Sequence, residues 1–153
     1  MHLILNMVSL YFFGPVIEHV FNLIFGTWGS VYFIALYILA IVVSDIPSYL
    51  KHNHNPGYNS LGASGGVAAI IFAFIVFLPI EKICLFFAIC VPGFILGTAY
   101  IIYSYFQRKK SNDNINHDAH LYGAAFGFLF CVIMYPPAIG NFFRQFMEWK
   151  MFD

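Results

Sequence analysis

The spacing of the few charged side chains is the feature that most constrains how this chain folds. Only 9% of its residues are Asp, Glu, Lys or Arg, whereas a soluble domain carries about 25%. A membrane-spanning helix needs about 20 mostly apolar residues, and the charges leave five uncharged stretches that can each hold one span. These stretches are Met1–Ile17 (the shortest), Val20–Ser44, His52–Ile80, Ile83–Gln107 and Ala119–Phe143.

The composition excludes a water-soluble fold. Hydrophobic residues make up 61% of the chain and Phe alone occurs 19 times, so there is too little polar surface to cover a globule of this size in water. Lys and Arg together number 7, as do Asp and Glu, and this balance excludes a nucleic-acid binder with a basic face. We therefore predict an all-α, polytopic membrane helix bundle whose solvent is the lipid bilayer.

Gly, Pro and charged residues divide the chain into five spans within a single domain, residues 1–153. Residues 80–91 form an apolar connector, predicted to be interfacial or a short helix, and the aromatic-rich tail, residues 138–153, is predicted to lie along the membrane interface. No basic region precedes the first apolar run, so a cleavable signal peptide is not indicated. We expect an integral, multi-pass protein of the plasma membrane, or of the inner membrane if the source is bacterial. The predicted spans are about residues 2–21, 30–50, 62–78, 92–107 and 118–135.

The three cysteines form no motif. Cys84, Cys90 and Cys131 are an odd number, they lie within apolar runs, and none has CxxC spacing. Such residues are more often buried thiols than members of a disulfide or redox pair. We therefore interpret all three as buried thiols.

Polar residues recur at the starts of the first, third and fifth spans. These three spans must run in the same direction through the membrane, so their starts share one face. His2 and Asn6 lie four apart on one side of the first span, Ser64 begins the third, and His120 begins the fifth. Because polar side chains inside a membrane are costly, they indicate function by default. The alternation of spans predicts that these four residues converge.

The chemistry that these residues support is acyl transfer. Ser64 can act as a nucleophile if a base takes its proton, and His120 is the histidine best placed to do so. Both lie near helix N-termini, where unpaired N–H groups favour an oxyanion and disfavour an imidazolium. His2 and Asn6 can complete the oxyanion hole. Asp118 is two residues from His120 and points elsewhere on the helix, so we predict a Ser–His dyad rather than a triad.

Each of these residues also has a simpler interpretation. Ser64 can be a small packing residue between Gly62 and Gly66, and His120 can form a hydrogen bond between helices. The Gly-x-Ser-x-Gly string also matches the nucleophile elbow of soluble hydrolases, but that motif requires a preceding strand. A small channel or transporter would need a polar stripe through the membrane, which the second and fourth spans lack.

A metal site is a further alternative at this face. The histidines lack a neighbouring Cys or carboxylate shell, so we expect no metal and no organic cofactor. The histidines concerned are His52, His54, His117 and His120.

Together these residues resemble the rhomboid family of intramembrane serine proteases. The resemblance covers nearly the whole chain, from the family's second helix to its sixth, and we expect the chain to lack the family's first transmembrane helix. The matching strings are His2-Leu-Ile-Leu-Asn6-Met, Gly62-Ala-Ser64-Gly65 and Ala119-His120-Leu121-x-Gly123-x-x-x-Gly127.

The resemblance implies a helix bundle around a water-filled cavity that cleaves the transmembrane segments of membrane-protein substrates. Ser64 would be the nucleophile and His120 the general base. His2, Asn6, Gly62 and Ser64 would bind the oxyanion and substrate, and no cofactor or nucleic acid would take part. The alternative within the same family is a catalytically inactive protein that binds transmembrane partners.

The chain departs from the family pattern at two further points. Ala68 stands four residues after the nucleophile, where many members have a Tyr that packs on the catalytic His. The positive-inside count also places the catalytic face in the cytoplasm, against the usual bacterial orientation of the family. That face carries Lys51, Arg108, Lys109 and Lys110, and the other carries Lys82, Arg144 and Lys150.

Overall fold

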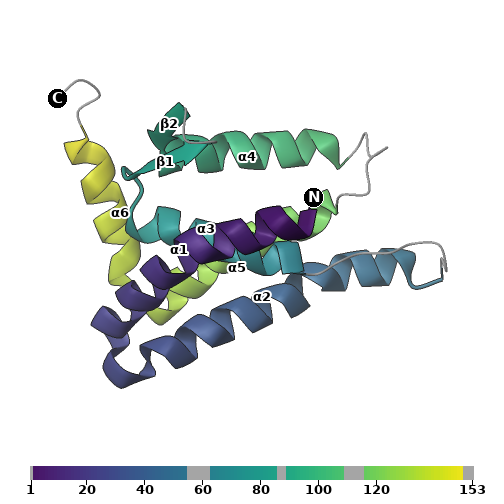
Figure 1. The fold of residues 1–153 in the computed structure, drawn as a ribbon, viewed down its shortest axis with the longest axis horizontal. Helices are drawn as coiled ribbons and strands as arrows, with labels where there is room; N and C mark the ends of the chain where they lie inside the picture. Colours follow the sequence, from purple (N-terminus) through teal and green to yellow (C-terminus); the bar gives the residue numbers. More distant parts are fainter. Residues whose placement is uncertain (1, 55–62, 86–88, 109–115, 150–153) are drawn as a thin grey trace.

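A computed structural model describes residues 2–54, 63–85, 89–108 and 116–149 and shows a mostly helical chain (Figure 1). This confirms the helical class predicted from the sequence. The helices are α1 (His2–Phe25), α2 (Gly29–His52), α3 (Ala63–Phe77), α4 (Gly93–Gln107), α5 (His117–Met134) and α6 (Pro137–Glu148), with a short 3₁₀ turn η1 (Gly26–Trp28) and two strands, β1 (Lys82–Leu85) and β2 (Ile89–Pro92).

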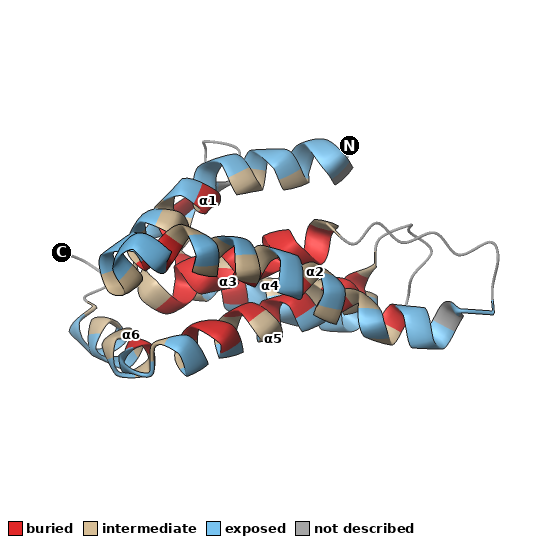
Figure 2. Cartoon of the chain, turned by 90° about the horizontal axis from the view of Figure 1, so that it is seen from below, coloured by how far each residue is buried: buried red, intermediate tan, exposed pale blue. Residues whose placement is uncertain are grey.

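Helix α3 forms the centre of the bundle. It buries twelve of its fifteen residues, and Figure 2 shows it as the most continuously buried element among α1, α2 and α5. Its sequence from Val67 to Phe77 contains only apolar residues, and a helix that is apolar all round is stable when other helices surround it. The central position of α3 therefore follows from its composition.

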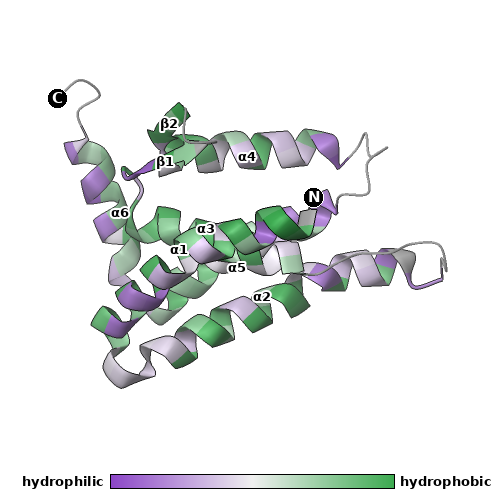
Figure 3. Ribbon diagram, viewed as in Figure 1, coloured by the Kyte–Doolittle hydropathy of each residue, from purple (hydrophilic) through white to green (hydrophobic). Residues whose placement is uncertain are grey.

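The outward faces of α1 and α2 are exposed and strongly apolar (Figures 2 and 3). Apolar surfaces of this extent would associate in water, whereas lipid tails cover them without cost. The exposed residues include Leu3, Ile4, Met7 and Val8 on α1 and Val31, Ile34, Ile38 and Val42 on α2. The exterior of the bundle thus suits a membrane.

Among the residues that the structure describes, two segments are long and apolar enough to cross a bilayer. They are Leu3–Lys51, which covers all but the first residue of α1 and the last residue of α2, and His117–Met134, which is α5. Helices α3 and α4 have 15 residues each. At about 1.5 Å per residue each is roughly 22 Å long, shorter than a hydrocarbon core of about 30 Å. The count of five spans therefore stays a prediction.

The short helix predicted as one alternative for residues 80–91 was wrong, because this connector contains two antiparallel strands, and its interfacial location stays a prediction. Strands β1 and β2 pair antiparallel, with Cys84 directly opposite Cys90, and the two cysteines form a disulfide. Both are exposed, whereas Cys131 is a buried free thiol. The buried-thiol interpretation therefore holds only for Cys131. Cys84 and Cys90 meet because of the register of the two strands. Their separation along the sequence does not predict that register.

The hairpin and α6 lie at the same end of the bundle, and α6 runs across the ends of the longer helices (Figure 1). Gln145 of α6 donates a hydrogen bond of 3.0 Å to the carbonyl of Phe77, one of the carbonyls that the end of α3 leaves unpaired. The ring of Phe94, at the start of α4, contacts Phe146 and Trp149 with centroid distances of 5.2 and 5.1 Å. These contacts tie α3, α4 and α6 together at the end away from the starts of α3 and α5.

We predict that Cys84 and Cys90 resist alkylation when the unreduced protein is unfolded in denaturant, while Cys131 reacts. Prior reduction should make all three cysteines react, and mass spectrometry of the peptides distinguishes the outcomes. In the control variant Cys84→Ser, Cys90 should react without reduction. Alkylation of both residues in the unreduced wild-type chain would contradict the disulfide.

Candidate active site

The site is organised by the close contact between α3 and α5. A Cβ atom added at Gly123 would overlap the backbone of Gly65, and one at Gly127 would overlap the backbone of Ala69. Because the contact advances by four residues on both helices, α3 and α5 run parallel, as the alternation of spans predicts. Small residues allow helix backbones to approach in this way. The first turns of α3 and α5 therefore lie at the same end.

This contact brings the turns that carry Ser64 and His120 together. Ser64 directly precedes Gly65, and His120 lies three residues before Gly123, on the same face of α5. Ser64 is buried, with 3% of its surface exposed. Its hydroxyl has no hydrogen-bond partner among the described residues, so the structure does not show a Ser64–His120 hydrogen bond. Catalytic hydrogen bonds are often long before substrate binds, which leaves the dyad a prediction.

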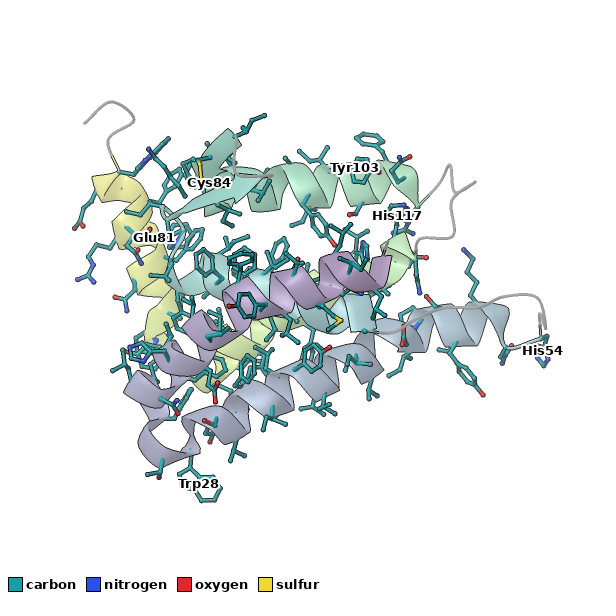
Figure 4. All side chains as sticks on the ribbon, in the orientation of Figure 1. Trp28, His54, Glu81, Cys84, Tyr103 and His117 are labelled. Carbon is teal, nitrogen blue, oxygen red and sulfur yellow. A yellow bond between two sulfur atoms is a disulfide. The ribbon has the colours of Figure 1, made fainter. Side chains whose placement is uncertain are left out.

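The ring of His120 contacts two other rings. Tyr100 of α4 stacks on it with a centroid distance of 5.8 Å and an angle of 27°. His117 meets it edge-on at 5.9 Å and also contacts Tyr103 at 5.8 Å. Figure 4 shows Tyr103 and His117 together at this end of the bundle, far from Cys84. Stacking against Tyr100 restricts the rotation of the His120 imidazole ring.

Sequence reasoning missed Tyr100. The resemblance placed the expected Tyr at position 68, where this chain has Ala68, and the structure supplies a ring from another helix. Tyr100 and Ala68 line the same small apolar cavity of about 50 Å³. A ring in a separate helix leaves no signal at a fixed spacing from Ser64, so only the packing of α4 reveals it.

The predicted oxyanion residues are only partly described. Asn6 lies on α1, is half-buried and belongs to a helix that packs on α3. His2 is the first residue of α1, but its side chain, like Gly62, lies outside the described residues. The grouping of these donors around Ser64 therefore stays a prediction.

Charged groups near the site pair with each other. The carboxylate of Asp118 lies 3.5 Å from Nε of Arg108, which joins the end of α4 to the start of α5. A carboxylate at a helix N-terminus and a guanidinium at a helix C-terminus both complement the helix dipole. Within the described part of the chain, no three His, Cys, Asp or Glu side chains gather in a way that would hold a metal.

Fold and site together define a helical membrane protein with a buried serine and a stacked histidine at the starts of two parallel helices. The chain belongs to the rhomboid family, since the family's sequence model, described as Rhomboid domain, matches residues 1–137. It is similar to the mitochondrial RHOMBOID-like protein 12 of Arabidopsis thaliana, with 33% identity over 135 residues that cover 81% of this chain. The chain spans 39% of that relative's length. No solved structure matches the chain.

We predict that Gly123→Ala destabilises the protein, because the added methyl group meets the backbone of Gly65, which cannot move away as a flexible side chain can. Such overpacking costs about 1–3 kcal/mol. Thermal unfolding of the purified protein in detergent measures the change.

Gly140→Ala is the matched control for this experiment. Gly140 also lies within a helix, but a Cβ there meets nothing within 4 Å. Since Ala favours helix by up to about 1 kcal/mol over Gly, this variant should unfold at the wild-type temperature or slightly above it. Equal unfolding temperatures of Gly123→Ala and Gly140→Ala would contradict the close contact between α3 and α5.

Proposed function

We propose that this protein is an intramembrane serine endopeptidase that cleaves transmembrane segments of membrane-protein substrates. The observation that carries the proposal is the contact of Gly65 with Gly123, which sets the turn of Ser64 against the turn of His120. In this proposal Ser64 is the nucleophile and His120 the general base. Membership of the rhomboid family supports the same activity.

The proposed reaction has two acyl-transfer steps. His120 takes the proton of Ser64 as Oγ attacks the scissile carbonyl carbon, and the resulting oxyanion is stabilised by the backbone N–H of Ser64 with His2 and Asn6. The peptide bond to nitrogen then breaks, and His120 gives its proton to the departing amine. His120 then deprotonates a water molecule, which attacks the acyl carbon; the bond from that carbon to Oγ breaks, His120 returns the proton to Oγ, and the carboxyl product leaves.

The bundle supplies the surroundings for this chemistry. We propose that residues 1–153 form a single multi-pass domain whose five predicted spans are embedded in the bilayer, with α6 at the interface. A transmembrane substrate then reaches Ser64, which is buried at the start of α3, and charge stabilisation is stronger at a buried site than in bulk water. Tyr100 acts as a positioning residue, because its ring covers one face of His120.

We predict that Ser64→Ala and His120→Ala each lower cleavage of a single-span reporter protein at least about a thousandfold. Both variants should also lose labelling by a fluorophosphonate, which reacts with activated serines, when the assay is run in detergent. Ser30→Ala should keep labelling and cleavage, since the Ser30 hydroxyl donates to Glu18 at 2.7 Å near the start of α2, away from Ser64 and His120.

Two outcomes would contradict the proposal. Labelling that persists in Ser64→Ala would exclude this serine as the nucleophile. A wild-type chain that is neither labelled nor active, yet binds transmembrane partners, would establish the inactive alternative.

The stacking of Tyr100 on His120 gives a separate prediction. Tyr100→Phe keeps the ring and should retain kcat within about twofold, whereas Tyr100→Leu removes it and should lower kcat about tenfold or more, since small displacements of catalytic groups are costly. Phe94→Leu is the matched control, because Phe94 packs at the far end of α4 and should leave kcat unchanged. Equal losses in both Leu variants would indicate a general effect on α4 packing.

A further inference from the structure

The turn that carries His120 is organised by one residue, Asn116. Its side-chain Oδ1 accepts a hydrogen bond of 3.0 Å from the backbone N–H of Ala119, which makes it the N-cap of α5. Its carbonyl oxygen accepts a hydrogen bond of 3.3 Å from the backbone N–H of His120. Asn116 therefore orders the first turn of α5, from which the His120 side chain projects.

The same side chain is bonded to a different helix. Nδ2 of Asn116 donates to Oγ of Ser48 on α2 at 2.7 Å, and the Ser48 hydroxyl lies 3.0 Å from Oδ1 of Asn116, to which it donates. Ser48 is buried, with 4% of its surface exposed. Loss of Asn116 would leave the buried Ser48 hydroxyl without this partner, which is costly for a buried polar group. The pair is thus a fixed link between α2 and the start of α5.

Helix α2 also contacts α3 next to Ser64. A Cβ atom added at Gly65 would overlap the side chain of Ser44, one turn before Ser48, and would lie 3.3 Å from the carbonyl oxygen of Ala119. Ser44 is fully buried and donates to the carbonyl of Ile41 in its own helix. One face of α2 therefore touches both the turn of Ser64 and the turn of His120.

We infer that Ser48 and Asn116 are positioning residues that set the location of His120 relative to Ser64. The inference rests on the proposed function, in which these two groups exchange a proton. The contact of Ser44 with Gly65 packs α2 against α3. The hydrogen bonds between Ser48 and Asn116 hold the first turn of α5 against α2. The contact of Gly123 with Gly65 sets the distance between α3 and α5. The Ser48–Asn116 hydrogen bonds set the position of the His120 turn relative to α2.

Kinetics of reporter cleavage in detergent test the inference. Ser48→Ala should lower kcat about tenfold with KM unchanged, because catalytic groups lose rate when displaced by fractions of an ångström. Ser48→Thr keeps the hydroxyl and should retain most of kcat. Asn116→Asp keeps the cap and accepts from Ser48, so it should be far more active than Asn116→Ala.

Ser30→Ala is the matched control for a lost hydrogen bond between helices. The Ser30 hydroxyl, near the start of α2, donates to Glu18 of α1 at 2.7 Å, at the other end of α2 from Ser48. This variant should keep the wild-type kcat. Equal losses of kcat in Ser30→Ala and Ser48→Ala would overturn the positioning role, since both would then reflect loosened packing.

A distance measurement tests the inference without relying on activity. Spin labels at the exposed positions Tyr49 on α2 and Tyr122 on α5 report the distance between these helices by pulsed electron paramagnetic resonance. Ser48→Ala should broaden the distance distribution and Ser30→Ala should not. An unchanged distribution in Ser48→Ala overturns the inference, whereas full activity of Ser64→Ala would overturn the proposed function and leave this measurement standing.

Discussion

The contact between α3 and α5 is the constraint on which the rest of the structure depends. Because Gly123 and Gly127 have no side chains, the two backbones come so close that a Cβ atom at either glycine would overlap the backbone of α3. Between helices in a bilayer there is no hydrophobic driving force, so association depends on close packing and on hydrogen bonds. The glycines supply the packing, and the parallel alignment that results places two helix N-termini side by side.

The two ends of the bundle differ in their chemistry. One end is held by the disulfide-linked hairpin, by α6 and by apolar ring contacts. The other end combines a buried serine, a stacked imidazole, the cap of α5 and the pair between Arg108 and Asp118. These polar groups lie beside the first turns of α3 and α5, whose unpaired N–H groups favour negative charge.

Some features of this site follow from local sequence and others do not. Charge spacing predicts α1, α2 and α5 to within a few residues, and the positions of Ser64 and His120 at helix starts follow from the same pattern. The hairpin was missed because residues 80–91 are uniformly apolar apart from Glu81 and Lys82, and such a run does not distinguish a strand from a short helix. Tyr100 was missed because a stacking partner from α4 depends on how helices pack.

The sequence by itself indicated the membrane environment, the helical class and the residues proposed for acyl transfer, because each depends on side-chain type and spacing along one chain. Tertiary structure alone decided which groups meet: Cys84 with Cys90, Tyr100 with His120, and Ser48 with Asn116. The physical reason is that these pairs arise from the register between separate elements. That register is set by glycine contacts and buried hydrogen bonds, whose partners are far apart in the sequence.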